Sequence, residues 1–193
     1  MNTNKKSTLL FDFFGVISTE IAPIWFEKHF DEESAVKLKA DIFVPADLGL
    51  ISEEETYLKM QELSRVPAEK IREDFYALVN INYELLDAIK ALRERYKVYI
   101  ISNASASFLR NILDTYSLYE YFDGVFISAE MKLAKPDTKY FNFVLDSIKI
   151  SASDAIMTDD NPNNVKAASE VGIEGIVFKN TEDFITKLYK ALN

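Results

Sequence analysis

The chain contains no cysteine and a single histidine, His29, among its 193 residues. Without cysteine it can form no disulfide and has no thiolate nucleophile. The missing cysteine also fits a reducing compartment, and we expect a cytoplasmic protein. His29 is expected to be a structural or exposed residue rather than a metal ligand or a catalytic base.

Long apolar runs and excess positive charge are also missing. No stretch approaches the length of a membrane span, and the first apolar run is too short for a signal peptide. With 22 basic and 31 acidic residues the net charge is -9, which disfavours nucleic acid and anionic membranes as partners. An anionic substrate must therefore be drawn in by local charge or by a metal ion. The sequence does not indicate an oligomeric state.

A hydrophobic content of 48% predicts a folded chain with one good core. A short apolar run extends from Thr8 to Asp12 and indicates a buried strand. From Lys97 onward, strand and helix patterns alternate, which predicts an α/β fold with a doubly wound parallel sheet and right-handed crossovers. The later strands are expected at 97–103, 124–128, 154–158 and 175–178.

The residues between the first and second strands have mainly helical patterns. Ser52-Glu53-Glu54-Glu55 is a capping box that opens a helix, and Pro45 and Gly49 mark a break. We interpret 18–80 as an inserted helical cap, and 1–17 with 81–193 as the α/β core domain. The aromatic residues of the insert are expected to pack in its core, with Trp25 and Phe26 as the alternatives for lining a pocket.

Polar side chains gather where the predicted strands end, which is where parallel α/β sheets bind ligands. Asp12 is a candidate nucleophile, while Ser102 and Asn103 are candidate donors to a substrate oxyanion. Lys135 brings a fixed positive charge. Asp12 and Asp160 are candidate ligands for a divalent cation such as Mg²⁺, which prefers oxygen ligands. Carboxylate nucleophiles form aspartyl-phosphate intermediates, so these groups suit phosphoryl transfer.

At this point the sequence resembles the haloacid dehalogenase-like hydrolase superfamily over essentially its whole length. The resemblance rests on four motifs in order: Phe11-Asp12-Phe13-Phe14-Gly15-Val16, Ile101-Ser102-Asn103, Lys135-Pro136, and Thr158-Asp159-Asp160-Asn161-Pro162-Asn163-Asn164-Val165. It implies a parallel sheet with a helical cap. It also implies Mg²⁺ held by Asp12, Asp160 and the backbone carbonyl of Phe14. Length and cap size resemble those of the family's sugar-phosphate phosphatases.

Three neighbouring residues have open roles. Asp159 is either a direct metal ligand or a group that supports the ligands. Asn164 either orients Lys135 or a metal-bound water, or caps the start of a helix. Without an ion, we expect Lys135 to compensate the repulsion between Asp12 and Asp160.

Phe14 departs from the pattern of the family's phosphatases, which usually carry a second aspartate at this position as general acid and base. General acid–base help is typically worth about 10²–10⁴-fold. A leaving group of low pKa, such as an anomeric phosphate, would need less of that help. The family's dehalogenases, which use no metal, place an aromatic residue here, but they use an arginine soon after the first motif, and the first arginine in this chain is Arg65.

The favoured prediction is a Mg²⁺-dependent phosphatase of a small phosphorylated metabolite, with sugar phosphates among the candidates and an aspartyl-phosphate intermediate on Asp12. Two alternatives stay open: a catalytically weak phosphate- or partner-binding protein, and a metal-independent 2-haloacid dehalogenase.

Overall fold

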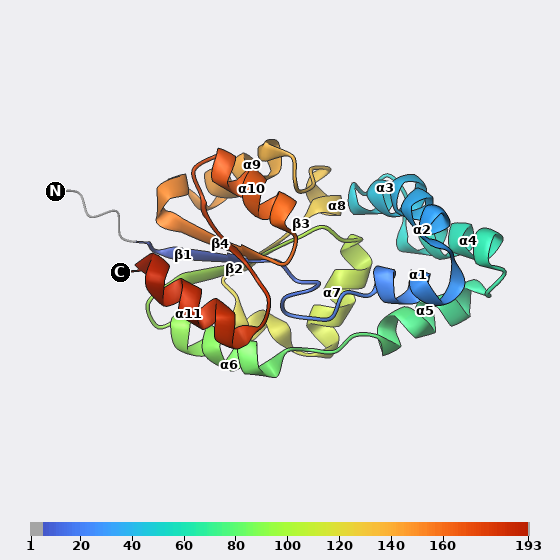
Figure 1. Cartoon of the computed structure of the whole chain (residues 1–193), viewed down its shortest axis with the longest axis horizontal. Helices are drawn as coiled ribbons and strands as arrows, with labels where there is room; N and C mark the ends of the chain where they lie inside the picture. The colour runs from blue at the N-terminus through green and yellow to red at the C-terminus, as the bar shows by residue number, and fades with distance from the viewer. Residues whose placement is uncertain (1–5, 193) are drawn as a thin grey trace.

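The fold is a five-stranded parallel sheet with helices on both faces, seen in a computed structural model that describes residues 6–192 (Figure 1). The strand order is β3-β2-β1-β4-β5, and all neighbours are parallel. This confirms the predicted doubly wound sheet. The strands are β1 (Thr8–Phe11), β2 (Lys97–Ser102), β3 (Gly124–Ile127), β4 (Ala155–Asp159) and β5 (Glu174–Val177).

The central strand β1 is apolar because both of its faces are covered. Leu9 and Phe11 join the larger core cluster, whereas Leu10 joins a second cluster with Ile101 and Tyr140. Successive side chains of a strand point to opposite faces, so one short apolar run supports both layers. The two faces are covered by different helices: α6 (Tyr83–Leu92) and α11 (Thr181–Leu192) on one, α9 (Thr138–Ile148) and α10 (Pro162–Glu170) on the other (Figure 1).

Helices α7 (Ala106–Thr115) and α8 (Ser128–Met131) follow β2 and β3. Helix α6 precedes β2 in the chain. Asn82 caps its start by accepting a hydrogen bond from the Leu85 amide at 3.0 Å, and the helix ends at Leu92.

The segment between β1 and α6 is mainly helical, as predicted, and lies beyond the carboxyl ends of the strands (Figure 1). The expected capping box is present: the Glu55 amide donates to Ser52 Oγ, and Glu55 Oε2 accepts from the Ser52 amide. The elements between β1 and α6 are α1 (Ala22–His29), α2 (Glu32–Leu38), a π-helical turn (Lys39–Phe43), α3 (Val44–Asp47), α4 (Glu53–Ser64) and α5 (Ala68–Ala77).

The break expected at Pro45 is wrong, because Pro45 lies in the first turn of α3, where a missing N–H costs nothing. The chain turns instead at Gly49, which has a φ of +64°.

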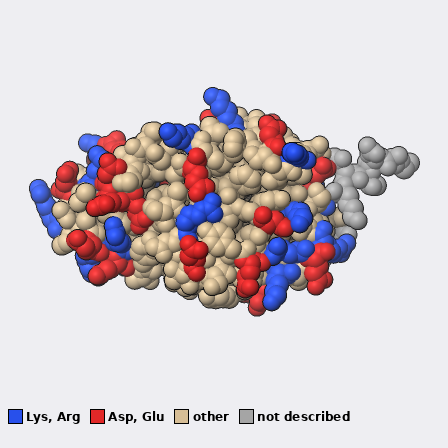
Figure 2. Space-filling view, turned by 180° about the vertical axis from the view of Figure 1, so that it is seen from behind, with Lys and Arg blue, Asp and Glu red and all other residues tan. Residues whose placement is uncertain are grey.

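Charged side chains of both signs are interspersed on the face that Figure 2 shows. On the face in Figure 2, Lys and Arg alternate with Asp and Glu. None of the helices within 6–192 is both long and apolar enough to cross a membrane.

Candidate functional site

The site forms where the order of the sheet reverses, between β1 and its neighbour β4. Phe11 is paired with Thr158, and the Asp12 amide donates to the Thr158 carbonyl at 2.9 Å. This register sets Asp12 beside Asp159, the last residue of β4. Ligands of open α/β sheets bind at such a switch point.

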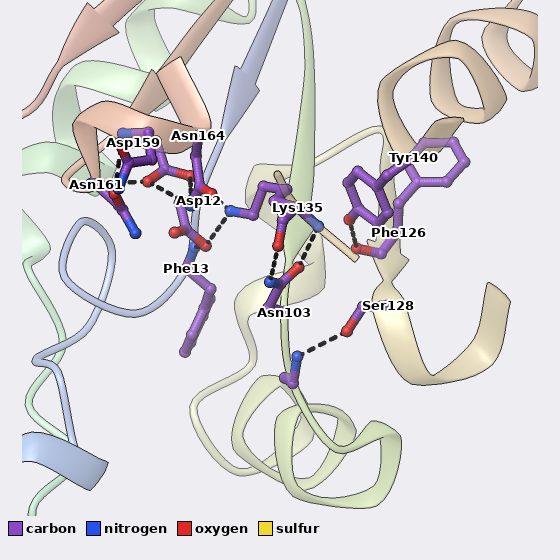
Figure 3. A network of polar contacts seen from close by, with 12 residues as sticks. Asp12, Phe13, Asn103, Phe126, Ser128, Lys135, Tyr140, Asp159, Asn161 and Asn164 are labelled. Atoms are coloured by element: carbon purple, nitrogen blue, oxygen red, sulfur yellow. Dashed lines mark hydrogen bonds and ion pairs between the residues drawn. The ribbon is translucent and has the colours of Figure 1, made fainter. Parts of the chain in front are cut away.

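Lys135 joins these two carboxylates from the loop between β3 and α9 (Figure 3). Its Nζ lies 2.9 Å from Asp12 Oδ1 and 2.6 Å from Asp159 Oδ2, and all three residues are buried. Asp12 Oδ1 also accepts the Phe13 amide at 2.7 Å. Lys135 thus contacts Asp12 and Asp159 directly, whereas it acts on Asp160 through its charge, which opposes the rise in the pKa of that carboxyl.

Asp159 is held by hydrogen bonds on both of its oxygens. Its Oδ1 accepts from the Asn161 amide at 2.8 Å, and Asn164 Nδ2 donates to Oδ1 at 3.0 Å and to Oδ2 at 3.1 Å. Asn164 therefore orients Asp159. It does not cap α10, because Asn161 does so by accepting from the Asn163 amide. Sequence reasoning missed Asn161, although an asparagine directly before Pro162 is a recognisable helix-start signal.

Asp160 approaches the turn that follows Asp12. Gly15 has a φ of +79°, and a Cβ placed on it would collide with the Asp160 carboxylate. Only glycine combines this backbone conformation with such a close approach. Gly15 thus fixes Asp160 next to the Asp12 loop.

Burial shifts the ionisation of this cluster. It raises the pKa of Asp12 well above its ordinary value, and Asp159 adds to the rise while Lys135 opposes it. Burial and the neighbouring Asp159 likewise raise the pKa of Asp160. Burial opposes a charged Lys135, yet Asp12 and Asp159 raise its pKa overall. Three carboxylates facing one ammonium make the cluster short of positive charge.

A divalent cation fits this donor set. Asp12, Asp159 and Asp160 each offer an oxygen, and the three oxygens lie within 4.8 Å of one another. Carboxylate oxygens suit Mg²⁺, and a charge of +2 balances the excess negative charge of the cluster. Asp12 and Asp160 stay the predicted ligands of the ion, and Asp159, which already accepts hydrogen bonds on both oxygens, is a third candidate. The Phe14 carbonyl stays a predicted ligand.

Asn103 and Ser102 are positioned differently from each other. Asn103 Nδ2 donates to the Lys135 carbonyl at 2.7 Å, and its Oδ1 accepts the Lys135 amide at 2.9 Å, so its side chain clamps the lysine loop (Figure 3). Ser102 is fully buried, and its Oγ has no hydrogen-bond partner among the described residues. Ser128 Oγ accepts the Ala104 amide at 3.0 Å and so ties the same turn to the end of β3.

A cavity of about 750 Å³ opens from this cluster toward the helical segment. Asp12, Lys135 and Asp160 line it, together with the half-buried Phe14. Phe26, an expected alternative for lining a pocket, does line the cavity, and so do Phe30, Phe43 and Phe75, for which only packing was expected. Phe26 and Phe75 also belong to the larger core cluster. Trp25 and His29 are not among its lining residues; they stack on each other, with ring centroids 4.1 Å apart.

Several similar proteins carry phosphatase names. The haloacid dehalogenase-like hydrolase family model matches residues 7–172. The chain is 24% identical over 161 residues to D-ribitol-5-phosphate phosphatase from Bacteroides thetaiotaomicron, covering 79% of this chain and 78% of that protein. It is 35% identical over 79 residues to the sesquiterpene phosphatase astK from Aspergillus oryzae, covering 41% of this chain. That match spans only 40% of the length of astK.

A solved structure of similar shape contains the ligands expected for this chemistry. It is the HAD family enzyme bt-2542 from Bacteroides thetaiotaomicron, in complex with magnesium and inorganic phosphate. Its TM-score is 0.76 at 28% identity, covering 90% of this chain and 94% of that one.

Proposed function

The chain belongs to the haloacid dehalogenase-like hydrolase family, and from this premise we propose that it is a Mg²⁺-dependent phosphatase of a small phosphorylated metabolite. Asp12 is the nucleophile in this proposal, and Asp12, Asp160 and the Phe14 carbonyl hold the ion. The helices of 18–80 act as the cap over the site. Related phosphatases and the magnesium and phosphate bound in bt-2542 support the proposal.

The observation that carries the proposal is the Lys135 ion pair with Asp12 at the wall of the cavity. Lys135 and the Phe13 amide both contact Oδ1. We therefore assign the attack to Oδ2. Lys135 fixes the orientation of the carboxylate and offers positive charge to the substrate phosphate.

The reaction proceeds by two displacements at phosphorus. Asp12 Oδ2 attacks phosphorus, the bond from phosphorus to the ester oxygen breaks, and the leaving group departs as an alkoxide with that bond's electron pair and takes a proton from solvent. Water then attacks phosphorus of the aspartyl phosphate and loses a proton to solvent; the bond from phosphorus to Asp12 Oδ2 breaks, which releases inorganic phosphate and restores the Asp12 carboxylate. When bound, Mg²⁺ neutralises charge on the phosphate oxygens. Asp159, held by Asn161 and Asn164, keeps Lys135 in place.

Phe14 cannot protonate the leaving oxygen. Solvent must supply that proton, so esters of acidic alcohols are the faster substrates. The dehalogenase alternative lacks support here, since lysines are the only cationic side chains that line the cavity among residues 6–192. A phosphate-binding protein of low activity would share the same geometry, and only turnover separates the two.

The test is phosphate release from a panel of phosphate esters, measured with and without Mg²⁺. We expect turnover that depends on the ion. Calorimetry should show weaker Mg²⁺ binding in Asp160→Asn, while Asp87→Asn, on the exposed side of α6, binds as wild type does. No phosphate release from any ester, including an activated aryl phosphate, would leave the binding protein as the better account.

A further inference from the structure

The cavity above Asp12 has an aromatic wall that begins at the position of the missing acid. Phe14 stacks on Phe108, with ring centroids 5.9 Å apart and an interplanar angle of 11°. Phe108 contacts Phe75 at 6.2 Å, Phe75 stacks on Phe43 at 6.1 Å, and Phe43 contacts Phe26 at 5.1 Å. All five rings line the cavity. We call this chain of rings the ring wall.

The polar side chains beside the ring wall are already hydrogen-bonded within the protein. Tyr57 Oη donates to Glu53 Oε1 at 3.2 Å, and Ser107 Oγ donates to Glu53 Oε2 at 2.5 Å. Thr56 Oγ1 donates to the Ser52 carbonyl at 2.8 Å. These groups hold the helical segment together, and their protons are already donated within the protein, so they can donate none to a ligand.

The other charged side chains that line the cavity form two groups: Glu20, Lys39 and Asp47 interact with the site, and Glu27, Asp31 and Glu32 are exposed to solvent. Glu20 interacts electrostatically with Asp160, Lys39 and Lys135, and Asp47 interacts with Lys39, Glu20 and Lys135. All three of Glu20, Lys39 and Asp47 line the cavity. The site is therefore polar around Asp12 and apolar along the ring wall.

We propose that the substrate is a phosphomonoester whose organic group is apolar, a hydrocarbon or an aromatic ring system that lies along the ring wall while its phosphate meets Asp12 and Lys135. This inference rests on the proposed function for the reaction and adds the substrate class. Each CH₂ group moved from water onto the wall gains about 0.8 kcal/mol. A polyol placed there would lose hydration without gaining hydrogen-bond partners.

The experiment separates binding from turnover. Binding of non-hydrolysable n-alkyl phosphonates of two, four and six carbons is measured by calorimetry with Mg²⁺, beside a polyol phosphonate of six carbons. We expect affinity to rise by up to about fourfold for each methylene and the polyol to bind most weakly. Affinity that is independent of chain length, preference for the polyol, or no binding of any phosphonate would overturn the proposed substrate class.

Turnover of the matching alkyl phosphates is measured in parallel. Alkyl and polyol phosphates with a primary ester oxygen have similar leaving groups, so their ratio of kcat/KM reports recognition of the organic group. Chain-length-dependent binding without any phosphate release would refute the phosphatase and leave the apolar site standing. Turnover with a preference for the polyol would support the phosphatase and refute the apolar site.

Variants test whether the chain-length dependence of binding arises at the ring wall. Phe43→Ala removes a half-buried ring of the wall and should flatten the chain-length dependence. Phe143→Ala, which removes a ring that is 43% exposed on α9 outside the cavity, is the matched control. If Phe43→Ala does not fold, Phe43→Ser and Phe26→Leu serve, since each removes one ring of the wall. An unchanged chain-length dependence in the folded variant would contradict the placement on the wall.

Discussion

At the scale of single residues, Phe14 links the two unusual properties of this site. It stands where a proton donor is expected from the family, and it begins the ring wall by stacking on Phe108. One side chain thus removes acid catalysis and adds apolar surface. Its identity was readable from the sequence, but its stacking was not, because Phe108 lies 94 positions away and is brought close only by the fold.

Restoring a carboxyl group at position 14 tests the first of these properties. Phe14→Asp should raise turnover of alkyl phosphates by about tenfold or more relative to activated aryl phosphates, because only poor leaving groups need the proton. Phe14→Asn, which has the same size but carries no proton to transfer at neutral pH, is the control. Equal changes in both substrate classes, in folded protein, would show that proton transfer is not what the phenylalanine lacks.

Substitution of Gly15 tests the role of Asp160 in Mg²⁺ binding, and the same substitution at Gly172 is the matched control. Both have positive φ, +79° and +92°, so alanine should cost about 1–2 kcal/mol of stability at either position. Only at Gly15 does the new Cβ collide with Asp160. Gly15→Ala should therefore weaken Mg²⁺ binding at least about tenfold in calorimetry, while Gly172→Ala leaves it unchanged. Equal Mg²⁺ affinity in the two variants would contradict the role given to Asp160.

At the scale of elements, the strands were predictable, because short apolar runs ending in polar residues are typical of buried parallel strands. The α2–α3 region was not. Its chain passes through a π-helical turn at Lys39–Phe43 and continues into α3 despite Pro45. The clamp of Asn103 on the Lys135 backbone also escaped prediction, since it depends on two loops meeting in space.

Asp47, the last residue of α3, should make the free energy of unfolding depend on pH. Burial raises the pKa of Asp47 from 3.8 to about 7. The folded state therefore holds this proton more tightly than the unfolded state does. The resulting stabilisation is complete below about pH 4 and is lost as the pH rises to about 7.

Asp47→Asn does not titrate and isolates this effect. Relative to wild type, it should gain about 1–2 kcal/mol in the free energy of unfolding between pH 5 and 7.5, a figure reduced for the partial exposure of the side chain. Urea unfolding at the two pH values, without added Mg²⁺, gives the measurement, and Asp87→Asn is the exposed control. A difference that stays constant with pH would show that Asp47 is ordinarily solvated.

At the scale of the whole molecule, the net charge of -9 gives no general attraction for an anionic substrate. Mixed charges on the face in Figure 2 agree with this. Recognition must therefore be local, at the point where Lys135, the carboxylates and the ring wall meet. The parallel sheet predicted that Asp12 would meet Asp160, but not that Lys135 would join Asp12 to Asp159. The size and lining of the cavity were not, because they depend on how α1–α5 pack over the strand ends.

The most direct test of the central claim compares phosphate release by wild type and Asp12→Asn, using an activated aryl phosphate with Mg²⁺. The substitution nearly preserves shape but removes the anionic nucleophile. We predict a loss of at least about a thousandfold, with circular dichroism showing that the variant is folded and with Asp87→Asn as active as wild type. Substantial turnover by folded Asp12→Asn would contradict the assignment of Asp12 as the nucleophile.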